Sequence, residues 1–278
     1  MTKKGKSARC LDTASVASEA DWYRAEEDWE TVRSHCKAWN GIRDLSLVSV
    51  FDRSKRICKM WEDHGHKAEA YDIAHHEIAM DICSRVGFFT LLNLLLRLVP
   101  NGFSFWAPPC SMWIFLTSSL HQRHVYGYGG DLKQFSVRLA NRIAANACVA
   151  LKAALKFRSS CRAMLEQPSG SWLFKGQLWQ DVISGFFLKR SLTYQGLFGG
   201  PLPKPTHLLH SLTSDELFAR KLTKKLRQKK KFNSNRQKVF YIKDSNGSVH
   251  GTKMLTSTSI YPKRFAAVIY KAWEQHSK

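Results

Sequence analysis

The sequence predicts an α/β fold of three layers, in which helices cover both faces of a parallel sheet. Two short apolar strands, residues 45–51 and 68–72, alternate with two helix-like segments, residues 54–64 and 86–99. Strands that alternate with helices at this spacing are typical of parallel sheets with right-handed crossovers. The chain has 278 residues, of which 44% are hydrophobic, and is therefore long enough to bury a substantial core.

The composition divides the chain into four segments. The first is basic and rich in Ser and Thr at its start, and residues 18–39 of the sequence are predicted to form a helix. The segments are an N-terminal extension (1–40), the α/β domain (41–206), a basic segment with a hairpin (207–255) and a C-terminal helix (256–278).

The strand at residues 103–106 ends at two prolines. Pro108 and Pro109 can neither donate to a ladder nor continue a helix, so Cys110 is expected on the loop that follows. In open α/β sheets, ligands bind at such carboxyl ends of strands. A further short strand is predicted upstream, at residues 78–81.

After Cys110 we expect a loop over residues 111–131, a long helix over 132–157 and a strand over 163–166 that runs into Gln167-Pro168. The inner face of the long helix is predicted to carry Phe135, Leu139, Ile143, Ala147 and Leu151. The later elements are predicted to be a helix (172–187), a strand (192–197), a turn-rich stretch (198–206), a hairpin within 239–253 that turns at Asn246-Gly247, and a helix (262–275).

The net charge of +21 is confined to the second part of the chain. Residues 1–116 hold 15 Lys and Arg against 15 Asp and Glu, whereas residues 117–278 hold 28 against 7. Such an excess favours a polyanionic partner, DNA or RNA, although a solvated basic tail is the alternative. The densest cluster, predicted to contact phosphates, is Arg220, Lys221, Lys224, Lys225, Arg227, Lys229, Lys230 and Lys231.

Seven cysteines without a CxxC pair argue against a disulfide framework and a zinc finger. They favour an intracellular compartment, with the nucleus as a candidate, and no metal site is expected. The most apolar run, residues 86–99, contains Asn93 and Arg97 and is too short to span a bilayer, so no membrane partner is expected.

Three predicted strand ends carry Asp72, Cys110 and Glu166, in that order along the chain. In this respect the chain resembles the DNA cytosine-C5 methyltransferases, S-adenosylmethionine-dependent enzymes built on a Rossmann-like sheet. That family places Pro-Cys after its fourth strand and a Glu-Asn motif after its fifth. The resemblance covers residues 45–206, and Tyr261-Pro-Lys-Arg-Phe265 loosely resembles the family's C-terminal motif.

The resemblance implies methyl transfer from S-adenosylmethionine to cytosine in DNA. Cys110 would be the nucleophile that adds to carbon 6, and Glu166 would bind the ring nitrogen and the exocyclic amine. The base would have to leave the stacked duplex to reach them. The resemblance assigns four residues to the cofactor: Phe51, Asp72 at the ribose hydroxyls, Asp81 near the adenine amine, and Pro108.

One departure from the family keeps a second hypothesis open. The turn after the first strand, residues 51–56, contains no glycine, whereas the family has a glycine-rich turn there. The chain is then a catalytically inactive nucleic-acid-binding protein on the same fold.

Residue by residue, other interpretations stay open. Cys110 can be an inert buried cysteine, Glu166 a helix-capping carboxylate and Asp72 an ordinary loop acid. A small-molecule Rossmann enzyme with an incidental basic tail is a third hypothesis. Amino-methylating enzymes carry Asp/Asn-Pro-Pro-aromatic at the same strand end, but Ala107 replaces their acceptor here.

Overall fold

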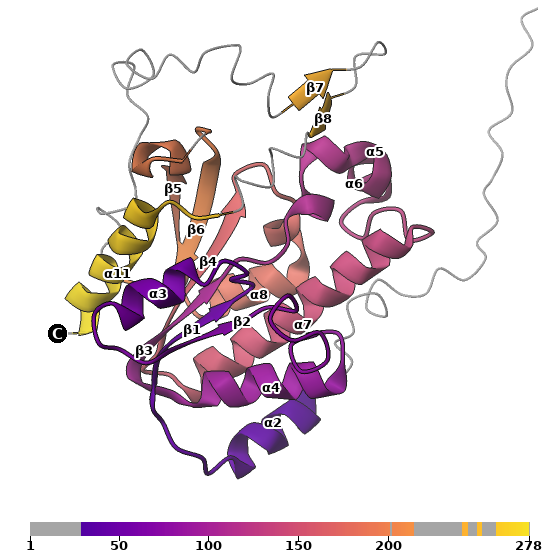
Figure 1. The fold of residues 1–278 in the computed structure, drawn as a ribbon. Helices are drawn as coiled ribbons and strands as arrows, with labels where there is room; N and C mark the ends of the chain where they lie inside the picture. Colours follow the sequence, from indigo (N-terminus) through magenta and orange to yellow (C-terminus); the bar gives the residue numbers. More distant parts are fainter. Residues whose placement is uncertain (1–28, 201, 214–240, 244–248, 252–259, 278) are drawn as a thin grey trace, which may run out of the picture.

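The structure is a computed structural model that describes residues 29–200, 202–213, 241–243, 249–251 and 260–277 (Figure 1). In these ranges a six-stranded sheet is flanked by helices, and a two-stranded hairpin forms a second sheet. The elements are α2 (Trp29–Ala38), β1 (Leu45–Val50), α3 (Arg56–Glu62), β2 (Ala68–Tyr71), α4 (Arg85–Leu96), β3 (Leu98–Trp106), η1 (Ser111–Trp113), η2 (Phe115–Thr117), α5 (Ser118–His121), α6 (Arg123–Tyr126), α7 (Phe135–Phe157), β4 (Arg162–Pro168), η3 (Leu173–Lys175), α8 (Gln177–Gly185), β5 (Lys189–Tyr194), η4 (Gln195–Phe198), β6 (Pro205–His210), β7 (Tyr241–Lys243), β8 (Val249–Gly251) and α11 (Lys263–Ser277).

The main sheet has the strand order β2-β1-β3-β4-β6-β5 and is mixed. The first four strands pair in parallel, as predicted. Strand β6 is antiparallel to both β4 and β5, which corrects the expectation of an all-parallel sheet. Parallel neighbours need a crossover of a dozen or more residues. The connection over residues 195–204 is shorter than that, so β6 returns antiparallel beside β5.

Side chains that alternate along the strands build two cores, one on each face of the sheet. Val50, Trp106 and Leu165 pack with residues of α4 and α7 in the first core. Phe105 and Met164 pack with residues of α3 and α11 in the second. Figure 1 shows α3 and α11 lying side by side, and α4 along α7. The predicted α/β class is therefore correct, and the C-terminal helix packs on the same sheet.

The predicted strand at residues 78–81 is wrong, because the backbone there makes local hydrogen bonds. Met80 N donates to His76 O at 2.9 Å, and Cys83 N donates to Asp81 Oδ1 at 2.9 Å. The hydroxyl of Ser84 donates to Asp81 O at 2.9 Å. A turn that satisfies its own polar groups in this way has no need of a neighbouring strand.

The predicted inner face of α7 is correct at Ala147 and Leu151, which are buried, and wrong at its start. Phe135 is 70% exposed and Leu139 is 37% exposed. Chain segment 108–113 faces the first turns of α7 across a cavity that Leu139 and Ile143 line, so these positions are not closely packed. The periodicity of the sequence indicates the spacing of the apolar positions on α7, but it does not show at which turn of the helix other segments begin to pack on them.

Other boundaries also differ from those predicted. The loop after Cys110 contains η1, η2, α5 and α6, and the helix predicted over 172–187 is divided into η3 and α8. The hairpin within 239–253 is confirmed by the antiparallel pairing of β7 with β8. Its Asn246-Gly247 turn lies outside the described residues, as does the first half of the predicted N-terminal helix, residues 18–28, whereas α2 forms in the second half.

Close packing of α4 against the Asp81 turn requires a glycine at position 87. A Cβ atom on Gly87 would lie 2.0 Å from the backbone oxygen of Asp81. We expect Gly87→Ala to lower the free energy of unfolding by about 1–3 kcal/mol or more, because backbone rather than a flexible side chain must move. Denaturant unfolding measures this. Gly185→Ala, in open space at the end of α8, is the control and should be neutral or slightly stabilising; equal losses for both would contradict the explanation.

Candidate functional site

Three neighbouring strands end together at one edge of the sheet. Val50 of β1 is paired with Trp106 of β3, and Trp106 with Leu165 of β4. Parallel strands in register deliver the residues that follow to the same edge. Asp52, Cys110 and Glu166, which come after or at these ends, are therefore brought to that edge from three separate parts of the chain.

Glu166 is a buried carboxyl group, 4% exposed, held by three donors. Gln195 Nε2 donates to Oε1 at 3.1 Å, and the hydroxyl of Tyr261 donates to Oε2 at 2.8 Å. The ammonium group of Lys204 lies 3.6 Å from Oε1. A buried carboxyl group needs such partners, because unpaired burial of a charge is costly. Two of the three donors come from the β5–β6 connection, and one from the residues before α11.

The thiol of Cys110 is within electrostatic reach of this carboxyl group. Burial raises the pKa of Cys110, the ammonium group of Lys204 lowers it, and the carboxyl group of Glu166 raises it. The backbone carbonyl of Cys110 accepts a hydrogen bond from Trp113 N at 2.9 Å, which fixes the cysteine at the start of η1. The two residues predicted as catalytic therefore lie in one cluster, with a lysine acting on both.

Three members of the cluster were not predicted as site residues: Gln195, Lys204 and Tyr261. Gln195 N donates to Lys204 O at 3.2 Å, so the two side chains that reach Oε1 of Glu166 are tied together through their backbones. Lys204 has a left-handed backbone, with φ 35°, which is costly for a residue with a Cβ atom. The one signal in the sequence was Tyr261, in the segment that loosely resembles the family's C-terminal motif.

Tyr261 is fully enclosed and remains a donor. Burial and the neighbouring Glu166 carboxyl group hold the pKa of its phenol well above the usual range, so the hydroxyl keeps its proton at neutral pH. The ring packs on Phe105 and Phe265, with centroids 5.4 Å away in both cases. The carbonyl of Tyr261 accepts a hydrogen bond from Arg56 Nη1 at 2.8 Å. Tyr261 thus connects the start of α3 with the carboxyl group on β4.

The turn between β1 and α3 contains no glycine, yet two of its residues have the left-handed backbone that glycine adopts most easily. Phe51 has φ 65° and Lys55 has φ 52°, both in the left-handed region. The buried carboxylate of Asp52 holds the turn: Oδ2 accepts from Ser49 Oγ at 3.1 Å and from Ile57 N at 3.2 Å. The side chain of Asp52 thus occupies the inner side of the turn where the resembled family has glycines.

Asp72 and Asp81, predicted to bind a cofactor, lie on either side of Tyr71 at the end of β2. Both acids and burial raise the pKa of the Tyr71 phenol, which places the two carboxylates near one hydroxyl. Asp72 Oδ1 accepts from Ala74 N at 2.9 Å, as Asp81 Oδ1 does from Cys83 N. Each acid therefore uses one oxygen to hold its own turn. Both side chains are half-buried.

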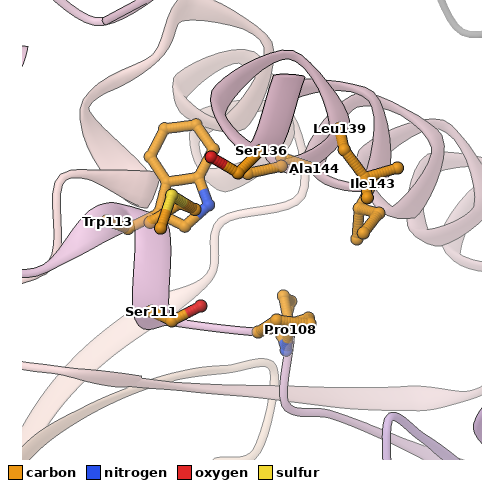
Figure 2. Close-up of a pocket in the computed structure, with 10 residues that line it drawn as sticks. Pro108, Ser111, Trp113, Ser136, Leu139, Ile143 and Ala144 are labelled. Atoms are coloured by element: carbon orange, nitrogen blue, oxygen red, sulfur yellow. The ribbon is translucent and has the colours of Figure 1, made fainter. Parts of the chain in front are cut away.

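Pro108 lies on the other side of the Cys110 segment and lines a cavity of about 220 Å³ (Figure 2). Figure 2 shows Trp113, Ser136 and Ile143 around the same space. The carbonyl of Pro108 accepts a hydrogen bond from Gln167 Nε2 at 2.5 Å. The lining is largely apolar, with hydroxyl groups from Ser111 and Ser136. The lining residues are Pro108, Pro109, Ser111, Met112, Trp113, Ser136, Leu139, Ala140, Ile143 and Ala144.

The basic cluster over 220–231 lies outside the described residues. Within the described ranges, no three His, Cys, Asp or Glu side chains come together as a metal site would require. Among the same residues, no helix combines the length and apolarity needed to cross a bilayer.

No known family model matches this chain, and no curated protein is similar enough to it to count as a relative.

The ammonium group of Lys204 should affect how the alkylation rate of the Cys110 thiol depends on pH. Because the ammonium group lowers the pKa of the thiol, Lys204→Gln should move alkylation of Cys110 to higher pH and slow it severalfold below the midpoint. Alkylation by iodoacetamide, followed at the Cys110 peptide by mass spectrometry across pH, measures this. Lys175→Gln, which removes an exposed lysine stacked on Trp172, is the matched control. An unchanged midpoint in Lys204→Gln would show that the ammonium group does not act on the thiol.

Proposed function

We propose that this protein is a DNA cytosine-C5 methyltransferase-like protein whose nucleophile is Cys110. The observation that carries the proposal is the cluster at the strand ends, where the register of β3 with β4 brings Cys110 to the same edge of the sheet as the buried carboxyl group of Glu166. Thiolates add readily to electron-poor carbon, and a fixed carboxyl group holds a ring that carries donor groups. Together these groups suit addition to the six-membered ring of a pyrimidine.

The arrangement of the sheet supports the proposal. Four parallel strands are followed by a reversed strand, β6, inserted between β4 and β5. The sheet, although mixed, is compatible with a Rossmann-like fold. The candidate residues also lie at the carboxyl ends of the central strands, where such sheets bind their ligands.

The chemistry assigns a separate task to each residue. The Cys110 thiolate forms a bond to carbon 6 of cytosine, and carbon 5 becomes nucleophilic. Glu166 holds the ring nitrogen and the exocyclic amine, and Tyr261 and Gln195 hold Glu166. After carbon 5 has gained a methyl group, a base removes the proton from carbon 5, the double bond between carbons 5 and 6 forms again, and sulfur leaves carbon 6 as the thiolate. The base must leave the helical stack to reach the buried carboxyl group.

The proposal assigns the methyl donor to the acids and to the cavity. When bound, S-adenosylmethionine supplies an electrophilic methyl group. Asp72 and Asp81 present carboxylates on one side of the strand ends, where hydroxyl and amine donors can be held. Pro108 contributes to an apolar cavity on the same edge. Phe51, in a left-handed turn after β1, completes the set.

The partner in this proposal is DNA or RNA, bound in part through the basic residues after Cys110. Phosphate contacts by Lys and Arg supply affinity without sequence preference. An intracellular location that holds nucleic acid, such as the nucleus, is part of the proposal.

A second function is favoured by one specific observation. The Asp52 carboxylate turns inward and bonds to Ser49 and Ile57, in a turn that is free of glycine. Side chains on such a turn keep a ligand away from its backbone. The alternative is therefore a nucleic-acid-binding protein that has kept the fold and lost the methyl transfer.

The proposal predicts a covalent adduct on DNA that carries 5-fluorocytosine. Fluorine in place of hydrogen at carbon 5 blocks the last step, so the bond from sulfur to carbon 6 persists. In the presence of S-adenosylmethionine, the wild-type chain should form an adduct that resists denaturation, and Cys110→Ser should form none. Cys148→Ser, a buried cysteine on α7, is the control and should trap as the wild type does.

Absence of an adduct separates the two functions when binding is measured alongside. Calorimetry with S-adenosylmethionine that gives no heat at millimolar ligand, together with retained DNA binding, would establish the inactive protein. Heat on donor binding without an adduct would refute Cys110 as the nucleophile.

The contact between Tyr261 and Glu166 gives a further prediction. Tyr261→Phe keeps the packed ring and removes the hydroxyl, which leaves a buried carboxyl oxygen without its donor. The free energy of unfolding should fall by about 1–3 kcal/mol, and adduct formation should slow. Tyr270→Phe, on α11, is the control: it removes a hydroxyl that lies 3.3 Å from His66 and bonds to the partly exposed Glu274, and it should lose less than about 0.5 kcal/mol. Equal losses would mean that the hydroxyl does not support the carboxyl group.

A further inference from the structure

Three aromatic rings are exposed on the part of the chain that follows Cys110. Phe115 on η2 is 79% exposed, Tyr126 on α6 is 59% exposed, and Phe135 at the start of α7 is 70% exposed. Single exposed rings are common, but three of this size within 21 residues are not explained by packing. Leu120, Val125 and Leu139 add exposed apolar surface in the same segment. We call the rings of Phe115, Tyr126 and Phe135 the aromatic surface.

The aromatic surface belongs to one unit that is firmly held. Arg123 is fully buried, and its guanidinium group lies 3.5 Å from the centre of the Trp113 ring. Its Nη2 donates to Asn141 Oδ1 at 3.0 Å, and Asn141 Nδ2 donates to Gly129 O at 2.9 Å. Figure 1 shows α5 and α6 beside the beginning of α7. The exposed rings are therefore carried on a scaffold fixed to α7.

Exposed cations lie close to these rings in the sequence. Residues 111–142 hold four Lys and Arg, of which Arg123 is buried, and a single acid, Asp131. Arg138 lies over the ring of Phe135, 5.9 Å from its centre, and both side chains are exposed. Lys133 and Arg142 are exposed as well. Aromatic rings among cations are the combination that binds unpaired nucleotides, because bases stack on the rings while the cations pair with phosphates.

We propose that the aromatic surface, with Lys133 and Arg138, binds unpaired nucleotides, so that the nucleic acid presented to Cys110 is single-stranded. The inference rests on the proposed function in naming its substrate class. Bases inside a duplex are stacked on each other and offer no free faces, so exposed rings gain little from a duplex. The surface begins five residues after Cys110 in the sequence. An unpaired base also reaches Cys110 and Glu166 without the cost of leaving a stack.

Fluorescence anisotropy with the full-length chain tests this. The probes are a labelled 16-nucleotide single-stranded DNA of mixed sequence, the same strand as RNA, and the matching duplex, at one fixed salt concentration. We expect both single strands to bind more tightly than the duplex. Phe115→Ala, Tyr126→Ala and Phe135→Ala should each weaken single-strand binding roughly fivefold or more and leave duplex binding unchanged. Preference between the DNA and RNA strands identifies the natural substrate.

Phe187→Ala is the matched control, because Phe187 is 86% exposed but lies between α8 and β5. It should bind single strands as the wild type does. Arg138→Gln should reduce the slope of log affinity against log salt by about one. Circular dichroism and the thermal midpoint should be unchanged in all four ring variants, since exposed rings contribute little to packing.

Three results would overturn the inference: single-strand affinity unchanged in the ring variants, equal losses for single strand and duplex, or duplex binding tighter than single-strand binding. Binding to a protein partner through the rings would appear as the first of these. Ring-dependent binding of single strands without a 5-fluorocytosine adduct would refute the enzyme and keep this inference. An adduct that forms equally well in all ring variants would keep the proposed enzyme and refute this inference.

Discussion

The parallel pairing of β3 with β4 is the constraint on which the candidate site depends. Cys110 and Glu166 are far apart in the sequence, and the register of Trp106 with Leu165 brings both to one edge of the sheet. That register is fixed by burial on both faces, because a shift by one residue would exchange the sides of Met164 and Leu165 between the two cores. The same apolar side chains that stabilise the fold therefore set the position of the thiol relative to the carboxyl group.

The alternation of side chains along β4 also divides the site into two compartments. Glu166 follows Met164 onto the face of α3 and α11, where Tyr261 donates to it. Gln167 follows Leu165 onto the face of α7, where it holds the carbonyl of Pro108 beside the cavity. Two adjacent residues thus support opposite sides of the Cys110 segment. In the proposed reaction, one side suits the base and the other suits part of the methyl donor.

The sequence predicted the main strands and their alternation with helices, because these follow from local patterns. The parallel register of β3 with β4 agrees with the expected neighbouring strand ends, while the catalytic roles of Cys110 and Glu166 stay predictions. The sequence did not predict the reversed strand β6, since the direction of that strand depends on the length of the β5–β6 connection and on the strands with which it pairs. The turn at Asp81 was mistaken for a strand because its short apolar run resembles one, whereas its polar groups form local hydrogen bonds within the turn. Lys204 and Gln195 were missed because their approach to Glu166 depends on the tertiary path of the β5–β6 connection.

The turn after β1 is where the fold and the proposed chemistry make opposite demands. A left-handed Phe51 is costly, and the surrounding structure must hold it in place. Here the hydrogen bonds of Asp52 to Ser49 and Ile57 do so, and Arg56 adds a link to Tyr261. Those contacts stabilise the start of α3, yet they use a side chain that enters the space a glycine would leave open. Because Arg56 and Tyr261 also connect this turn to Glu166, a ligand that displaced Asp52 would loosen the support of the carboxyl group. The turn after β1 and the carboxyl group of Glu166 are therefore physically linked through Arg56 and Tyr261.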